Sequence, residues 1–309
     1  MSFDDMDVDT IWFDGEFLDW EDATVHVLTH ALHYGTGVFE GIRCYDTEEG
    51  PAVFRLDAHL DRLYRSCEPY GLELPYDLEE LREATLELID SQDLRSCYIR
   101  PIVFYGYDSL GIDPRSCPVR TAIACWPWGA YLGEDAQEQG VDVQVSSWRK
   151  YPSSSLPTTA KSTGTYLNGL LAGEEARRHG YHEAILLNER GTVAEGPGEN
   201  LFLVRDGRIY TPAVAEDILD GITRSVVIQL ARDLGYPVDA GATIGRGELY
   251  TADELFFCGT AVEVTPIHRV DDVVVGDGGR GEVTTEIQTR FFDVVNRRTD
   301  AYEDWFTYV

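Results

Sequence analysis

The chain has 309 residues, of which 55 are acidic and 25 basic, and 43% are hydrophobic. The apolar content is enough to bury a core, which excludes a disordered chain. The net charge of −30 is typical of saline-adapted (halophilic) proteins. Because the sequence has no cluster of lysine and arginine, this charge excludes nucleic acid and anionic membranes as partners.

The N-terminal residues MSFDDMDVDTIWF are acidic where a signal peptide is positively charged. No apolar run approaches the roughly 18 residues of a membrane span. We therefore expect a cytoplasmic protein. The cysteines are scattered and lack C-x-x-C spacing, so we expect buried free thiols and no metal site. They are Cys44, Cys67, Cys97, Cys117, Cys125 and Cys258.

The first part of the chain mixes strands and helices. Alternation around Asp14-Gly15 predicts a hairpin over residues 10–20. A strand is expected at 51–56, and Asp57 is expected to cap a helix over 58–71, with Arg62 near the edge of its buried stripe. Further on, the sequence predicts an amphipathic helix at 77–92 and interior strands at 97–107 and 120–128.

A polar stretch bounded by glycines follows, and we place an interdomain linker at 131–140. Beyond it, apolar runs at 141–148, 183–189, 200–210 and 254–260 predict strands, and periodic patterns at 221–235 and 283–298 predict helices. The expected fold class is α/β, in the sense of mixed α+β layers. We expect a smaller α/β domain over 1–130 and a larger domain over 141–309.

Lysine is nearly absent from the chain, which has 23 arginines and only Lys150 and Lys161. Arginine keeps its proton at any biological pH, whereas a desolvated lysine can lose one and form a Schiff base with a carbonyl. Lys161, in TTAKSTGTYLNG, is therefore a candidate for such chemistry, and an ordinary solvated lysine is the alternative. Lys150 lies beside an arginine in a polar stretch and is expected to be ordinary.

Other segments offer what pyridoxal phosphate requires besides a lysine, namely an acid opposite the ring nitrogen and a phosphate cradle. Glu195 lies in a glycine-rich turn, for which an exposed surface turn is the alternative. The predicted helix start in LDGITR offers the amides of Ile222 and Thr223, and Thr260 follows a predicted strand. Arg62 offers a charge-assisted bond to phosphate, or else a solvent-facing salt bridge.

Two further patterns are interpreted as structural. The glycine-rich GDGGRG at 276–281 lacks the spacing of a dinucleotide motif and is expected to form a hairpin loop. His30 and His33 lie three residues apart without the H-E-x-x-H pattern of zinc proteases. We expect both histidines to be packed side chains.

Taken together, seven segments in order resemble the branched-chain amino acid aminotransferases, which are fold type IV enzymes that use pyridoxal 5′-phosphate. The segments are HALHYGTGVFEGIRCY, YIRPIVFYGYDSLGI, PWGAYLG, TTAKSTGTYLNGLLAGEEARRHGY, AEGPGENLF, LDGITR and CGTAVEVTPI. The resemblance covers nearly the whole chain. It implies a smaller N-terminal α/β domain, a larger C-terminal domain with a pseudo-barrel of strands, and a homodimer at minimum.

The resemblance also implies roles for individual residues. Lys161 would carry the cofactor as a Schiff base and shuttle the substrate's proton. Glu195 would keep the ring nitrogen protonated, and Tyr166 would bind the phenolic oxygen. The phosphate would be held by Arg62, Ile222, Thr223 and Thr260, with Leu219 packed against the ring.

Substrate-binding residues follow from the same resemblance. Those matching an aromatic side-chain pocket are Phe39, Trp128, Tyr131 and Tyr166. Those matching carboxylate-binding groups are Arg43, Tyr98, Arg100 and the Thr260-Ala261 amides. Those matching elements donated by a second subunit are Tyr34, Leu110, Gly111 and Ile112. Many relatives have asparagine where this chain has Thr165, which leaves the hydrogen bonding near the ring open.

The implied activity is reversible transamination of L-leucine, L-isoleucine and L-valine with 2-oxoglutarate. A D-amino acid aminotransferase and a lyase of the aminodeoxychorismate type are alternatives on the same fold. Outside this class stand a lysine-dependent aldolase without a cofactor and a catalytically silent phosphate-ligand binder.

Overall fold

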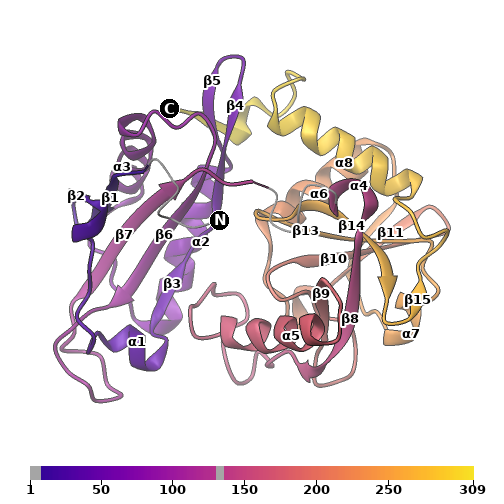
Figure 1. The fold of residues 1–309 in the computed structure, drawn as a ribbon, viewed down its shortest axis with the longest axis horizontal. Helices are drawn as coiled ribbons and strands as arrows, with labels where there is room; N and C mark the ends of the chain where they lie inside the picture. Colours follow the sequence, from indigo (N-terminus) through magenta and orange to yellow (C-terminus); the bar gives the residue numbers. More distant parts are fainter. Residues whose placement is uncertain (1–7, 130–135) are drawn as a thin grey trace. The chain divides into compact units, whose positions relative to one another are not determined.

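The computed structural model describes residues 8–129 and 136–309 (Figure 1). The described chain forms two compact units. Unit 1 contains the described residues up to Trp128 together with Ala160–Gly164 and Val294–Val309, and unit 2 contains the rest. The domain boundaries expected from the sequence stay a prediction. The mixed α/β fold class is confirmed, because each unit combines a sheet with helices.

Unit 1 is built on one eight-stranded antiparallel sheet in the order β16-β5-β4-β6-β7-β1-β2, with β3 paired to β6. In chain order its elements are β1 (Thr10–Phe13), β2 (Glu16–Asp19), α1 (His30–Tyr34), β3 (Gly37–Phe39), β4 (Ile42–Thr47), β5 (Gly50–Phe54), α2 (Leu56–Cys67), α3 (Leu78–Ser91), β6 (Cys97–Tyr105), β7 (Val119–Trp126) and β16 (Phe306–Tyr308), with short 3₁₀ helices at Trp20–Asp22, Glu68–Tyr70 and Glu303–Trp305.

The predicted hairpin at the start of unit 1 is confirmed. Phe13 of β1 pairs with Glu16 of β2, so Asp14 and Gly15 form a two-residue loop. Both loop residues have positive φ, 50° and 91°, as a type I′ turn requires. Glycine and aspartate tolerate this conformation, which explains why Asp-Gly marks the turn.

Helices α2 and α3 pack against the sheet of unit 1 and close its core. The predicted α3 is confirmed, and Asp77 and Glu80 form a reciprocal capping box at its start. The prediction that Asp57 caps α2 is wrong. Arg55 adopts a left-handed conformation directly after β5, which turns the chain so that α2 begins at Leu56. Asp57 therefore lies in the first turn, where a carboxylate favours the helix dipole.

Unit 2 is built on a mixed eight-stranded sheet in the order β12-β11-β10-β13-β14-β8-β9, with β15 paired to β14. In chain order its elements are α4 (Ala136–Gln139), β8 (Val141–Arg149), α5 (Tyr166–Arg178), β9 (Glu183–Leu187), β10 (Asn200–Arg205), β11 (Arg208–Pro212), a 3₁₀ helix at Val214–Glu216, α6 (Ile222–Asp233), β12 (Val238–Ala242), α7 (Arg246–Leu249), β13 (Glu254–Gly259), β14 (Glu263–Val270), β15 (Val273–Val274) and most of α8 (Glu282–Val295).

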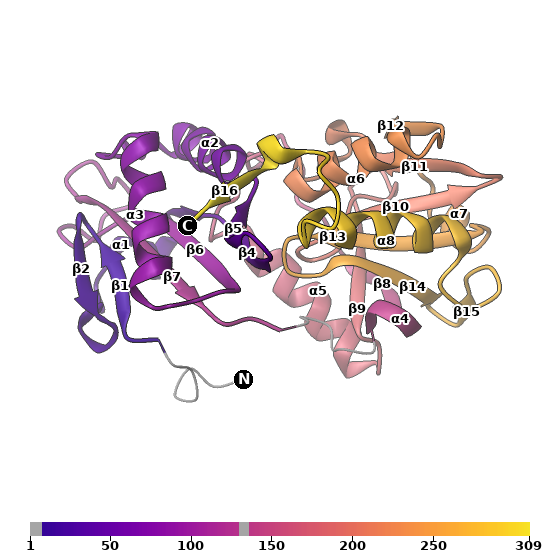
Figure 2. The same ribbon diagram turned by 90° about the horizontal axis from the view of Figure 1, so that it is seen from above.

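The parallel pair β8–β9 needs a crossover connection, and α5 supplies it by packing along both strands (Figures 1 and 2). Helix α6 packs against β12 and β13. The unit's main core is mostly aliphatic, and Phe257 from β13 and Val143 from β8 are fully buried in it. The other predicted strands and helices of this half are confirmed, with ends that differ by a few residues. The run predicted as a strand at 200–210 is instead a hairpin, because Asp206 and Gly207 turn the chain between β10 and β11.

Some expectations need correction. The glycine-rich 276–281 segment is not a hairpin loop but joins β15 directly to α8, which begins at Glu282. His30 is buried as expected, whereas His33 is exposed and lies near Val27, to whose carbonyl its Nε2 is hydrogen-bonded. All six cysteines are buried free thiols, as predicted. Within the described part of the chain, no helix combines the length and apolar character needed to cross a membrane.

Candidate active site

The backbone of Lys161 is hydrogen-bonded through both its amide and its carbonyl. Its amide donates to the hydroxyl of Ser66 on α2 at 3.0 Å, and its carbonyl accepts from the amide of Phe39 at 3.0 Å. Thr163 donates through its hydroxyl to the Gly35 carbonyl at 2.9 Å. The segment 160–164 is therefore fixed against β3 and α2 within unit 1.

Glycine is required where this segment approaches α1. Gly35 ends α1 with φ 64°, and a Cβ built on it would lie 2.7 Å from the Cα of Gly164. A side chain at Gly35 would push the lysine segment away, because this distance is below van der Waals contact, whereas a Cβ at Gly164 would lie 3.1 Å from the Gly35 carbonyl oxygen, a tight contact. The two glycines thus set the position of Lys161 along β3.

The side chain of Lys161 is partly buried, and its Nζ lies 5.0 Å from the centre of the Phe39 ring. Burial and the positive charge of Arg62 lower the pKa of Lys161 from 10.5 to about 8, against the opposing effect of Glu40. Desolvation disfavours the ammonium, and a neighbouring cation adds repulsion. A usable fraction of the amine is therefore neutral near pH 7.

Arg62 is buried on α2, which excludes the solvent-facing salt bridge considered from the sequence. Its Nε and Nη2 donate to the two oxygens of Glu40 at 2.7 and 2.8 Å. His59, one turn earlier on α2, lies with Nδ1 2.8 Å from Glu40. Burial alone would raise the pKa of Glu40, but Arg62 and His59 hold it well below its usual range. Burial lowers the pKa of His59, so the ring donates to Glu40 as a neutral imidazole.

An aromatic cluster lies on the β6–β7 face of the same unit. The Tyr98 ring packs 5.3 Å from Trp126 and 5.2 Å from Trp128. Arg100 places its guanidinium 4.7 Å from the Phe39 ring and 5.2 Å from the Tyr98 ring. No acidic residue among those described pairs with Arg100. The cluster is an apolar wall with one cation available for an anionic ligand.

In unit 2, Glu195 is 5% exposed and receives three hydrogen bonds. Its Oε2 accepts from the Asn200 side chain and from the Leu219 amide, both at 3.0 Å, and its Oε1 accepts from Lys150 at 2.5 Å. The predicted alternative of an exposed surface turn is therefore wrong. A carboxylate has about four acceptor positions, so this one is oriented by the protein and has capacity for a further donor.

Lys150 is not the ordinary solvated lysine that its polar neighbours predict. It follows β8, is 8% exposed, and forms an ion pair with Glu195. Burial would lower the pKa of Lys150, but the charges of Glu195, Tyr151 and Tyr166 raise it above 10.5. The surroundings of the two lysines therefore have opposite effects: those of Lys161 favour the neutral amine, whereas those of Lys150 favour the ammonium.

The predicted start of α6 in LDGITR is confirmed. Gly221 is its N-cap and provides no side-chain cap, and no acidic residue lies in the first turn. The amides of Ile222 and Thr223 have no partner within the helix and carry the positive end of the dipole. A Cβ on Gly221 would lie 2.0 Å from Asn200 Oδ1, so glycine is needed for Asn200 to reach both Glu195 and this helix start.

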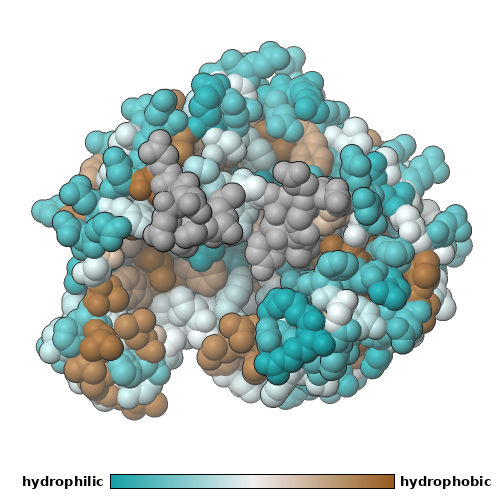
Figure 3. Space-filling model, in the orientation of Figure 1, coloured by the Kyte–Doolittle hydropathy of each residue, from teal (hydrophilic) through white to brown (hydrophobic). Residues whose placement is uncertain are grey.

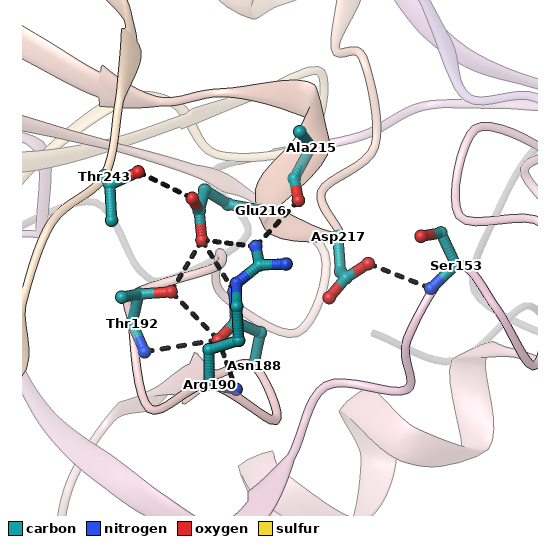
Figure 4. Close-up of polar contacts among 8 residues, drawn as sticks. All are labelled: Ser153, Asn188, Arg190, Thr192, Ala215, Glu216, Asp217 and Thr243. Carbon is teal, nitrogen blue, oxygen red and sulfur yellow. Dashed lines mark hydrogen bonds and ion pairs between the residues drawn. The ribbon is translucent and has the colours of Figure 1, made fainter.

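A buried acid supports the loop that leads to α6 (Figure 4). Glu216 accepts from Asn188, Arg190, Thr192 and Thr243 at 2.6 to 2.8 Å. Burial raises its pKa, but these donors outweigh that and lower it to about 2. The loop that supplies the Leu219 amide to Glu195 therefore begins at a fixed point.

The remaining predicted residues are distributed over both units. Arg43 of β4 pairs across the sheet with Tyr98. Tyr166 is the first residue of α5 after its N-cap Thr165, and Thr260 and Ala261 follow β13. The residues predicted to match elements donated by a second subunit, Tyr34, Leu110, Gly111 and Ile112, are exposed around α1. Tyr131 lies outside the described residues.

Sequence reasoning missed five residues of these clusters. They are Glu40, His59, Trp126, Lys150 and Asn200. A signal existed for two of them, because His59 and Arg62 are three apart on one helix face, and Lys150 is one of two lysines. Asn200 lies only five residues from its partner Glu195, but the partners of Glu40 and Lys150 lie 22 and 45 residues away, so no local pattern reveals those two pairs.

Comparison with known proteins shows which family this chain resembles in sequence and backbone. A family model described as class IV amino-transferase matches residues 37–270. The branched-chain-amino-acid aminotransferase of Pseudomonas aeruginosa is 48% identical over 309 residues, which are 100% of either chain. The crystal structure of the Escherichia coli branched-chain amino acid aminotransferase has a TM-score of 0.95 and 48% identity, covering 97% of this chain and 98% of that one.

A second solved structure is a T.th. branched-chain amino acid aminotransferase with pyridoxamine 5′-phosphate. It has a TM-score of 0.94 and 46% identity, covering 97% of this chain and 98% of that one. Similarity of this extent in sequence and backbone identifies the family. This chain belongs to the class IV aminotransferases.

Proposed function

We propose that this chain transfers the amino group reversibly from L-leucine, L-isoleucine or L-valine to 2-oxoglutarate, with pyridoxal 5′-phosphate as cofactor. The observation that carries the proposal is Lys161, whose pKa of about 8 makes it a competent amine. The neutral amine is the form that attacks a carbonyl. Relatives that are 48% identical over the full chain bear the name branched-chain-amino-acid aminotransferase.

The residues present fit this cofactor. Lys161 offers the amine for an aldehyde, and the uncapped start of α6 suits a phosphate. Glu195 is a buried, oriented carboxylate that suits a protonated ring nitrogen. When bound, pyridoxal phosphate accepts the electrons left on the substrate's α-carbon after its proton is removed.

The protein's own residues would divide the remaining tasks. Lys161 holds the cofactor and then moves the proton at the α-carbon. Tyr166 binds the phenolic oxygen, and Leu219 packs against the ring. Arg62, Ile222, Thr223 and Thr260 bind the phosphate.

Substrate recognition is assigned to the aromatic cluster. Phe39 and Trp128 offer an apolar surface for an aliphatic side chain, and Tyr98, assigned to the carboxylate, packs against Trp128. Arg100, which no described acid neutralises, binds a carboxylate. Arg43 and the Ala261 amide are assigned to the same carboxylate-binding task, which a single pocket must perform for both leucine and glutamate.

A homodimer is part of the proposal. Ile112 is 85% exposed, Val27 70% and Leu32 62%. Figure 3 shows apolar side chains gathered at the α1 end of unit 1. Tyr34 is tied to this surface through its hydroxyl, which donates to the Leu110 carbonyl at 2.8 Å. A patch of this kind on a strongly acidic chain favours contact with a second subunit. The cytoplasmic location stays a prediction.

The deciding experiment is an amino-donor panel in concentrated salt with 2-oxoglutarate as acceptor. We expect turnover of L-leucine, L-isoleucine and L-valine, and loss of activity in Lys161→Ala. Activity restricted to D-enantiomers would replace the proposal with a D-amino acid aminotransferase. Release of pyruvate from aminodeoxychorismate without transamination would replace it with the lyase.

Colour separates the two more distant alternatives. Purified protein loaded with pyridoxal phosphate should be yellow, and borohydride should bleach it. Colourless, cofactor-free protein that cleaves aldol substrates would indicate the aldolase. Cofactor retained without transamination of any donor would indicate a phosphate-ligand binder.

A further inference from the structure

The two lysines of this chain both lie beside residues assigned to the cofactor, but only Lys161 has a role in the proposed reaction. Lys150 is buried after β8, and its backbone amide donates to the Leu187 carbonyl at 2.9 Å. Its Nζ is 2.5 Å from Glu195 Oε1 and 4.6 Å from the centre of the Tyr151 ring. Tyr166, assigned to the phenolic oxygen, also acts electrostatically on Lys150.

The hydrogen bonds of Glu195 are divided between its two oxygens. The Asn200 side chain and the Leu219 amide donate hydrogen bonds to Oε2. Among the described residues, Lys150 is the one donor to Oε1. Without a donor on Oε1, the carboxylate would be fixed at one end only and could turn about its terminal torsion, which is broad for glutamate. Two anchored oxygens instead fix the direction of the remaining lone pairs.

We propose that Lys150 is a positioning residue that anchors Glu195 through Oε1, so that the carboxylate presents a fixed acceptor to the protonated ring nitrogen of the cofactor. This inference rests on the proposed function. The ammonium also compensates the charge of a carboxylate that is 5% exposed, which would otherwise be costly to bury. Its action on the reaction passes through Glu195 and not through contact with the substrate.

The test compares Lys150→Met, Lys150→Gln and Lys150→Arg in the enzyme loaded with pyridoxal phosphate labelled with ¹⁵N in the ring. We expect Lys150→Met to lower kcat by about tenfold to a hundredfold, the effect of losing one charge-assisted hydrogen bond. KM for L-leucine should change little. The ¹⁵N signal of the ring should move toward that of the unprotonated nitrogen. Lys150→Arg, which keeps the charge, should restore both, and Lys150→Gln should lie between them.

Two controls separate this role from a merely structural one. Rates are normalised to bound cofactor, because a purely structural residue would reduce the folded fraction without moving the ¹⁵N signal. In a Glu195→Gln background, adding Lys150→Met should have no further effect on kcat or on the ¹⁵N signal. If Lys150→Met does not fold, the other two variants test the same prediction: Lys150→Arg should have a higher kcat and a more protonated ring nitrogen than Lys150→Gln.

Wild-type kcat and ¹⁵N signal in Lys150→Met would overturn the inference, and so would equal losses in the Glu195 and Glu195→Gln backgrounds. Equal values in Lys150→Gln and Lys150→Arg would also overturn it, because charge would then be irrelevant. Failure of the proposed function is distinguishable, because loaded wild-type protein would then turn over none of the three L-amino acids. The ¹⁵N signal of the ring in loaded wild type and Lys150→Met would still test the anchoring of Glu195, since it does not depend on turnover.

Discussion

Replacing Lys161 by methionine should stabilise the apoprotein while it abolishes transamination. The side chain of Lys161 is partly buried beside Arg62, and its pKa falls from 10.5 to about 8 on folding. Methionine has a similar length and needs no hydration. The reactive amine therefore makes the folded protein less stable at neutral pH, as strained functional sites often do.

The magnitude follows from proton linkage. Between pH 8 and pH 10.5 the unfolded chain binds a proton at Lys161 that the folded chain does not. Stability of the wild type therefore rises with pH through this window. At 1.36 kcal/mol per pH unit, the difference in proton affinity costs the wild type about 3 kcal/mol near pH 7. About 2 kcal/mol of this should be recovered by roughly pH 9.5.

The assay is urea unfolding of the apoprotein, wild type and Lys161→Met, followed by tryptophan fluorescence at fixed protein and salt concentrations. The quantity of interest is the difference in free energy of unfolding between the two proteins at about pH 7 and about pH 9.5. Other titrating groups are shared and cancel in this difference. A difference that does not change with pH, or a wild type that is more stable at neutral pH, would refute a desolvated Lys161.

Three more outcomes are expected. Glu40→Gln should lower the free energy of unfolding by about 3–5 kcal/mol in urea titrations, since Arg62 would lose a buried partner. As a control, Asp61→Asn replaces an exposed residue on α2, the helix of Arg62, and should change the free energy of unfolding by less than about 0.5 kcal/mol. Equal effects of the two substitutions would contradict the buried pair. Arg100→Met should raise KM for 2-oxoglutarate by about tenfold to a hundredfold, while the surface variant Arg95→Met leaves steady-state kinetics unchanged. The melting temperature should climb as potassium chloride increases from about 0.1 to 2 M, because the screening length shrinks from about 10 Å to less than 3 Å; a flat profile would argue against saline adaptation.

Local signals in the sequence predicted the elements whose causes are local. The Asp14-Gly15 turn and the start of α3 at Asp77 depend on residues within a few positions of one another. The start of α2 was misplaced because Arg55, not Asp57, turns the chain. A left-handed arginine leaves no pattern in the sequence.

The candidate site was predictable where the family resemblance supplied the residues. It was less predictable where a charged partner far along the chain determines whether a residue is buried and paired. Nothing near Lys150 indicates burial, because Glu195 lies 45 residues further along the chain. Glu40 was missed for the same reason, since its partner Arg62 is 22 residues away. Scarcity of lysine was informative for both lysines and was applied to only one.

The central claim is that Lys161 is the amine that holds the cofactor, and the scarcity of lysine makes it directly measurable. The protein is loaded with pyridoxal phosphate, reduced with borohydride, digested and mapped by mass spectrometry. We predict a single pyridoxyl group on the peptide that contains Lys161 and none on Lys150, which is held as an ammonium by Glu195. A label on Lys150, or reduced protein with no label on either lysine, would contradict the account.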